Sequence, residues 1–84
     1  MVNKWYLLGK INASRYRKGI LKSLLEKPKT PTDLQKELKI KISHISRGLK
    51  ELSDDGIIVC LTPELRKNKF YSVTELGKKI SKEL

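Results

Sequence analysis

The sequence predicts a mainly α-helical domain that carries one small β-hairpin. Three patterns indicate this fold class: helical spacing of apolar residues in three stretches between residues 13 and 54, two short β-branched runs after them, and a last apolar helical stretch. A chain of 84 residues buries only about 60% of its unfolded surface, so it supports one small core. We therefore predict a single domain over residues 1–84, within which residues 1–12 form an N-terminal segment.

The first clear helix is predicted over residues 13–27. Tyr16, Ile20 and Leu24 recur at intervals of four and give this helix one apolar face. The apolar residues 5–11 before it fit either a helix or a strand.

The second helix is predicted to begin after Thr30. Thr30 can cap it, Pro31 suits its first position, and the charge of Asp33 suits a helix N-terminus. Leu34 and Leu38 are expected on its buried side.

The third helix is predicted over residues 42–54, after a turn at residues 39–41. Its buried face is expected from apolar residues at helical spacing, which are Ile42, Ile45, Leu49 and Leu52. Gly56 is expected to end the helix in a left-handed conformation. Two short helices joined by a tight turn are the pattern of a DNA-binding helix-turn-helix.

The opposite face of the third helix carries the candidate base-reading residues. At about 100° per residue, Ser43, Arg47 and Lys50 point away from the core. Arg47 has the donor geometry for a bidentate contact to a guanine edge. The DNA-contacting residues predicted for this helix and its turn are Lys41, Ser43, His44, Ser46, Arg47 and Lys50. Thr32 and Gln35, near the start of the second helix, are expected to hold a phosphate.

Residues 57–61 and 70–73 predict the two strands of a hairpin. The loop between them, residues 62–69, is basic, and a basic tip can lie on the DNA backbone or in the minor groove. Its predicted DNA-contacting residues are Arg66, Lys67 and Lys69. Thr74 is expected to cap a last helix over residues 75–84. The whole order predicts a winged helix-turn-helix, with a three-helix core, a wing and a C-terminal helix.

The charge of the chain favours a nucleic-acid partner. There are 19 Lys and Arg against 9 Asp and Glu, a formal net charge of +10, and the basic residues are spread along the chain. No apolar run approaches the roughly 18 residues that span a membrane, and the apolar residues are needed for the core rather than for a lipid surface. The single cysteine, Cys60, excludes an internal disulfide and fits a reducing cytoplasm.

The sequence offers little for catalysis or for metal binding. It has one histidine, His44, and one cysteine, Cys60, whereas a metal site needs three or four ligands. It has no glycine-rich phosphate loop and no evident pairing of a nucleophile with a base. We therefore expect no enzymatic activity, no cofactor and no metal, and we expect Cys60 to be a small core residue.

Several motifs carry a resemblance to a known family. They are SRYR, TPTDL, SHISRGLKEL, CLTPE and FYSVTELGKK, in this order, between residues 14 and 80. Together they resemble the small single-domain winged-helix regulators that are common in archaea, which are grouped with ArsR/MarR-like transcriptional regulators. The resemblance implies a recognition helix over residues 42–54 and a wing around residues 64–69.

The resemblance also implies a homodimer that pairs through its terminal helices. In this chain the implied interface residues are Trp5, Tyr6, Leu76 and Ile80. Two positions depart from the family pattern: Lys39 stands where the turn often has glycine, and Lys41 stands where serine often caps the recognition helix. The cysteine pair by which some ArsR proteins sense metals is absent from residues 42–54, so a metal response is not implied.

We therefore expect sequence-specific binding of double-stranded DNA by a cytoplasmic transcriptional regulator, with no small-molecule effector evident. Two alternatives stay open: a non-specific architectural DNA-binding protein, favoured by the high charge, and a protein-interaction winged helix that docks on the transcription machinery. RNA binding is disfavoured because the five aromatic residues are expected mostly in the core rather than on a stacking platform.

Overall fold

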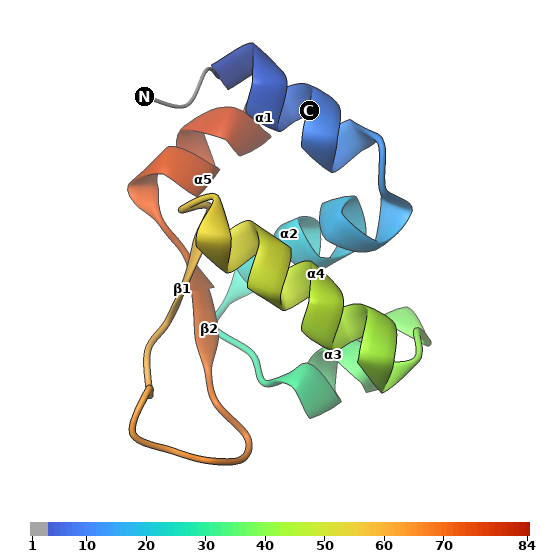
Figure 1. Cartoon of the computed structure of the whole chain (residues 1–84), viewed down its shortest axis with the longest axis vertical. Coiled ribbons are helices and arrows are strands. Elements are labelled where there is room, and N and C mark those ends of the chain that lie inside the picture. The colour runs from blue at the N-terminus through green and yellow to red at the C-terminus, as the bar shows by residue number, and fades with distance from the viewer. Residues whose placement is uncertain (1–3) are drawn as a thin grey trace.

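A computed structural model of the protein describes residues 4–84 (Figure 1). The elements in chain order are α1 (Lys4–Asn12), α2 (Arg15–Glu26), α3 (Pro31–Leu38), α4 (Ile42–Asp54), β1 (Ile58–Cys60), β2 (Tyr71–Val73) and α5 (Glu75–Ser81). This confirms the predicted order, and α4 has the predicted bounds. The N-terminal apolar segment is helical, while the strands and the last helix are shorter than predicted. Residues 1–3 of the predicted N-terminal segment lie outside the described residues.

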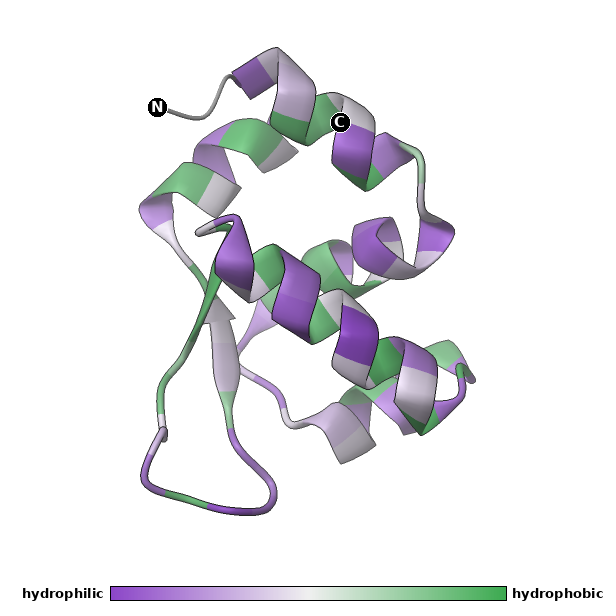
Figure 2. Ribbon diagram, viewed as in Figure 1, coloured by the Kyte–Doolittle hydropathy of each residue, from purple (hydrophilic) through white to green (hydrophobic). Residues whose placement is uncertain are grey.

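Helix α2 is the centre of the core, because it contacts all four other helices and β2. Its residues Ile20, Leu21 and Leu24 are each at most 2% exposed. The rest of the buried apolar core consists of Leu7, Leu8, Ile11, Leu34, Ile45, Leu49, Leu52, Ile57, Ile58, Val73 and Ile80. Figure 2 shows the resulting alternation of hydrophobic and hydrophilic segments along α4.

Capping residues fix where the helices begin. The Ser14 hydroxyl accepts a hydrogen bond from the Arg17 N–H (3.3 Å), so α2 starts two residues later than predicted. At α3, the Thr30 hydroxyl accepts from the Asp33 N–H and the Asp33 carboxylate accepts from the Thr30 N–H, a reciprocal capping box. After α4, Gly56 adopts φ 76°, the left-handed conformation predicted for it.

The two strands form an antiparallel hairpin, in which Ile58 lies opposite Val73 and Cys60 opposite Tyr71. Tyr71 also pairs with Lys29 through two backbone hydrogen bonds of 3.1 and 2.9 Å, so the segment between α2 and α3 is attached to the hairpin. The structure has packed helices, of which α3 and α4 form a helix-turn-helix, and a long hairpin that is followed by a last helix. This arrangement confirms the predicted winged helix-turn-helix.

The predicted buried face of the third helix is wrong at Ile42, which is 44% exposed. Ile42 lies in the first turn of α4 and about 60° around the helix from Ile45, so it falls at the edge of the buried stripe. Gly48 occupies the buried stripe instead. A Cβ atom built on Gly48 would lie 2.6 Å from Cδ1 of Ile20, which shows how closely α4 packs on α2.

The placement of the aromatic residues and of Cys60 also differs from the prediction. None of the five aromatic residues belongs to the buried core: Trp5, Tyr6 and Phe70 are exposed, and the other two are only partly buried. Cys60 is partly buried rather than part of the core. Isoleucine and leucine make up most of the small core, and of the aromatic residues Tyr71 packs against it.

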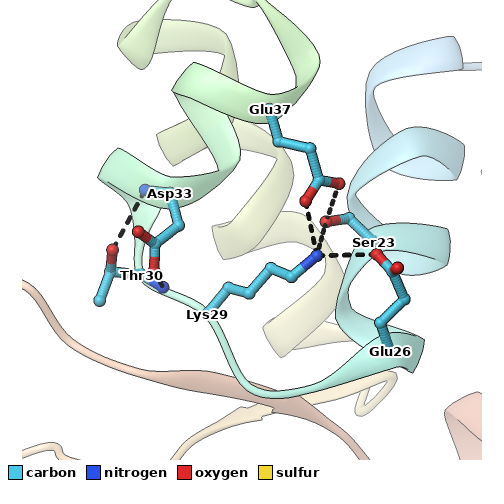
Figure 3. A network of polar contacts seen from close by, with 6 residues as sticks. All are labelled: Ser23, Glu26, Lys29, Thr30, Asp33 and Glu37. Atoms are coloured by element: carbon cyan, nitrogen blue, oxygen red, sulfur yellow. Dashed lines mark hydrogen bonds and ion pairs between the residues drawn. The ribbon is translucent and has the colours of Figure 1, made fainter.

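A buried lysine joins α2 to α3, which sequence patterns did not indicate (Figure 3). Lys29 is 4% exposed, and its Nζ donates hydrogen bonds to Glu37 (2.6 Å), Ser23 (2.7 Å) and Glu26 (2.9 Å). The Ser23 hydroxyl in turn donates to Glu37. Burial lowers the pKa of Lys29, but the bonds to the two glutamates outweigh it, so this pKa lies above its usual value.

Candidate nucleic-acid interface

The outward face of α4 is polar and open. Ser43, Ser46, Arg47 and Lys50 are exposed, while Ile45, Gly48, Leu49 and Leu52 are buried against the core. Lys50 lies 3.4 Å from the Asp54 carboxylate, but both side chains are well exposed, so the pair holds Lys50 only weakly. The face therefore presents hydrogen-bonding side chains on a helix of 13 residues, which fits a DNA major groove.

His44 is more constrained than the other predicted site residues. Its ring stacks on the Tyr16 ring of α2, with centroids 4.6 Å apart and an interplanar angle of 14°. Both residues are partly buried. The stack fixes His44 at one edge of the outward face, at the junction between α2 and α4.

The turn before α4 contains Lys39 and Lys41, the two lysines that depart from the family pattern, and both affect its local structure. Lys39 adopts a left-handed conformation (φ 55°), where glycine is the easier residue, and its N–H donates to the Gln35 carbonyl. Lys41 is the N-cap of α4 and makes no side-chain capping bond. Thr32 and Gln35, on the neighbouring α3, are exposed. Helix α3 packs against α4, so Thr32 and Gln35 lie on the element next to the outward face of α4.

The wing lies away from the helical core, at the lower left in Figure 1. Arg66 and Lys67 are exposed, Lys69 is half-buried, and Asn68 between them adopts a left-handed conformation (φ 55°). The Phe70 N–H donates to the Thr62 hydroxyl (3.0 Å), which closes the base of the loop. The wing residues therefore lie apart from the α4 residues. The hairpin still packs on α4, because β1 contacts both α4 and β2.

The basic residues divide into neutralised and free groups. Lys10 pairs with Asp55 (2.9 Å), and Arg17 pairs with Glu51 (2.8 Å) while also donating to the Lys10 carbonyl. The bond to Asp55 raises the pKa of Lys10 despite an opposing contribution from burial. Among the ion pairs of residues 4–84, none uses the cations that we predicted at the turn, at Arg47 or in the wing. These remain available to an anionic partner.

Sequence patterns missed part of the surface beside α4. Arg15 and Tyr16, in the first turn of α2, line a hollow together with His44 and the turn. The helical spacing predicts Tyr16 on the apolar face of α2. Its contact with His44 depends on how α2 and α4 pack together. A second hollow of about 440 Å³ lies between α4 and the hairpin, with Lys50 and Cys60 in its lining.

The predicted dimer residues fall into different environments. Trp5 and Tyr6 are 69% and 60% exposed on α1, and Leu76 on α5 is 41% exposed. Ile80 is 0% exposed, so the prediction that it lies in a dimer interface is wrong. Its position four residues after Leu76 suggested one common face, but α5 turns that side chain into the core.

The described part of the chain, residues 4–84, contains no helix that is both long and apolar enough to cross a membrane. Within the same residues, no three His, Cys, Asp or Glu side chains gather as potential metal ligands.

Several solved structures resemble this protein. HlyU from Vibrio cholerae N16961, in its reduced form, is 29% identical with a TM-score of 0.74, over 93% of this chain and 82% of that one. The adhesin competence repressor AdcR from Streptococcus pyogenes is 25% identical with a TM-score of 0.73, over 83% of this chain and 53% of that one. The chain thus spans about half the length of AdcR, and also of Lactococcus lactis ZitR.

TubR from Bacillus thuringiensis serovar israelensis, whose structure holds 24 bp of tubC, has a TM-score of 0.83. The match covers 98% of this chain and 91% of TubR, but at 13% identity it is a likeness of fold alone.

No curated protein matches the sequence. A family model does match it: the model described as "Bacterial regulatory protein, arsR family" covers residues 15–59, more than half of the 84 residues. These residues include α2, the whole helix-turn-helix and most of β1. The chain therefore belongs to the arsR family of bacterial regulatory proteins.

Proposed function

We propose that this protein binds double-stranded DNA in a sequence-specific manner and acts as a transcriptional regulator. The observation that carries the proposal is the outward face of α4, on which Ser43, Ser46 and Arg47 are exposed and Arg47 is free of any ion pair within residues 4–84. Membership of the arsR family supports it, and so does the likeness to TubR, whose structure contains DNA.

In the proposed complex, α4 enters the major groove and the wing lies on the backbone or in the minor groove. Arg47 reads a guanine edge, and Ser43, His44 and Ser46 contact bases or phosphates near the start of α4. Lys41 and Lys50 meet phosphates. Other proposed phosphate contacts are Thr32, Gln35, Arg66, Lys67 and Lys69.

The salt dependence of binding tests whether DNA is the partner. If six to eight phosphates are neutralised, log affinity falls with log salt at a slope of roughly −5 to −7. A slope near zero, or no shift of duplex DNA at physiological salt, would instead favour the protein-interaction alternative. Selection of bound fragments from genomic DNA supplies the specific site for the next test.

Substitution of Arg47 tests sequence reading. Arg47→Ala should weaken binding to the selected site by about 1–3 kcal/mol and weaken binding to random duplex much less. Lys50→Ala is the matched control on the same helix face. It should weaken binding to the two duplexes alike, because Lys50 is proposed to contact a phosphate. An equal loss on both duplexes for Arg47→Ala, with no site preferred in the selection, would support the architectural alternative that the charge of +10 favours.

We also propose a homodimer that pairs through Trp5, Tyr6 and Leu76, since these side chains are exposed on the two terminal helices. A cytoplasmic location fits the proposed DNA partner. The archaeal affiliation implied by the sequence motifs stays a prediction, since the matching family model is a bacterial one.

A further inference from the structure

A basic hollow lies at the start of α4, beside the proposed reading face. Its volume is about 330 Å³, and its lining residues are Arg15, Tyr16, Lys39, Ile40, Lys41 and His44. This lining contains three cationic side chains and an imidazole, but no carboxylate. In Figure 1 the turn between α3 and α4 lies at the right, whereas the wing lies at the lower left, so the hollow and the wing are at different ends of the candidate interface.

The wall of the hollow is preorganised by aromatic stacking. The Tyr16 and His44 rings are nearly parallel and 4.6 Å apart, and they join α2 to α4. The Arg15 guanidinium lies 5.6 Å from the centroid of the Tyr16 ring, within the range of a cation–π contact. A planar guanidinium held in this way keeps its remaining donors for an oxyanion.

The charge of this hollow is uncompensated, in contrast to that of its neighbour. A hollow of about 300 Å³ also has Tyr16 and His44 in its lining, and there Arg17 is neutralised by Glu51 at 2.8 Å. None of the ion pairs found in residues 4–84 uses Arg15, Lys39 or Lys41. Cations gathered without a counter-charge form a local positive potential that attracts anions.

Two backbone features lie at residues that line this hollow. Lys39 adopts φ 55°, a conformation that costs free energy for any residue with a Cβ and little for glycine. Any side chain at this position therefore lowers local stability relative to glycine. Lys41, the N-cap of α4, makes no side-chain capping bond, so an anion there would meet the positive end of a helix of 13 residues.

From these observations we infer that the hollow binds a phosphate group through Arg15, Lys39, Lys41 and His44. The inference rests on the proposed function in one respect: when DNA is bound, the phosphate is one of the backbone phosphates that flank the major groove. A free phosphate-bearing ligand offers the same chemistry, and the test separates the two sources.

The first arm of the test uses inorganic pyrophosphate, titrated into the full chain and followed by NMR at the Tyr16 and His44 ring signals. We expect saturable shifts of both signals. Lys39→Gly should weaken this binding about tenfold, the effect of losing one charge-assisted hydrogen bond. Because glycine suits φ 55°, the variant should keep or raise the melting temperature, so a loss of binding is not a loss of folding. Lys79→Gln on α5 is the control for charge and should leave the binding unchanged.

The second arm measures the salt slope of duplex binding for the same variants. A slope reduced by about 1 in Lys39→Gly, but not reduced to the same extent in Lys79→Gln, assigns the phosphate to DNA. Pyrophosphate binding with an unchanged DNA slope assigns the hollow to a free phosphate ligand and overturns the DNA assignment. Unmoved Tyr16 and His44 signals, or equal shifts in Lys39→Gly, overturn the site itself. If pyrophosphate binds but duplex DNA does not, the proposed function fails while the phosphate site stands.

Discussion

At the scale of single residues, Lys29 is the least expected feature of the chain, because lysine is seldom fully buried. Its ammonium donates hydrogen bonds to Glu26, Glu37 and Ser23, and its backbone pairs with Tyr71. One residue thus connects α2, α3 and the hairpin. The two glutamates keep part of their side chains in water, so the pair avoids the full cost of burying a carboxylate.

Lys29→Met should lower the free energy of unfolding by about 1–3 kcal/mol, because it removes the charge-assisted bonds. It leaves the Ser23 oxygen without its lysine donor and leaves Glu37 with the Ser23 hydroxyl as its remaining side-chain donor. Urea unfolding measures the change. The exposed Lys22 of α2 is the matched control, and Lys22→Met should change stability by less than about 0.5 kcal/mol. A Lys29→Met protein as stable as the parent would show that apolar packing replaces the cluster fully.

At the scale of elements, the capping box of α3 matters because this helix has only eight residues and one buried side chain, Leu34. Helices this short are marginal by themselves. Thr30→Ala removes the acceptor for the Asp33 N–H and should cost about 0.5–2 kcal/mol of stability in thermal unfolding. Thr32→Ala, on an exposed residue of the same helix, should cost little. Equal effects of the two substitutions would refute a special role for the cap.

The wing is the second element whose contribution can be isolated. Replacing Arg66, Lys67 and Lys69 by glutamine should reduce the salt slope of DNA binding by about 2–3, because each lost phosphate contact removes about 0.9 from it. Replacing Lys78, Lys79 and Lys82 near the C-terminus removes the same charge from another part of the molecule and should change the slope less. If both triple variants change the slope equally, overall charge rather than wing contact explains the effect.

At the scale of the whole molecule, the exposed aromatic residues of α1 give a test of assembly. Trp5→Ala combined with Tyr6→Ala should raise the dimer dissociation constant by more than about tenfold, since aromatic anchors dominate interfaces. Sedimentation velocity measures the change, and circular dichroism should show an intact fold because both side chains are largely exposed. Phe70→Ala, an exposed aromatic outside the terminal helices, is the control. A parent protein that sediments as a monomer at high concentration would refute the interface.

The whole fold also has a predictable pH range. The bond from Lys29, followed by that from Ser23, lowers the pKa of Glu37 below 4.5, and hydrogen bonds from Thr30 lower the pKa of Asp33 below 3.8. A carboxyl group whose pKa is lowered by folding stabilises the folded state at pH values above its ordinary pKa. This stabilisation is lost as the pH falls through the pKa of the folded state. The raised pKa of Lys29 acts in the opposite sense, and its contribution disappears as pH rises above about 10.5.

We therefore expect unfolding by urea to require less denaturant below about pH 4 and above about pH 10.5 than between these values. The double variant Asp33→Asn, Glu37→Gln should lose part of the acid dependence. An acid limb with the same slope in this variant would place the responsible carboxylates elsewhere.

Much of the fold could be predicted because its signals are local. The bounds of α4, the cap at Thr30 and the left-handed glycine at residue 56 depend on signals within one or two turns of chain, and each appears in the structure as predicted. The outward direction of Arg47 follows from helical geometry in the same way.

Only the tertiary structure decided which apolar and charged side chains meet. The spacing that predicted a buried Ile42 does not say how far a neighbouring helix extends, and Ile42 is exposed. The family resemblance implied Ile80 as a dimer contact, but packing places it in the core. Likewise, the burial of Lys29 and the stacking of Tyr16 on His44 join residues from separate elements. The sequence by itself determined the helix-turn-helix, its wing and its positive charge, because these follow from local spacing and composition. Contacts between elements depend on how helices pack in space, and that packing decided which cations are neutralised and which remain free for a phosphate.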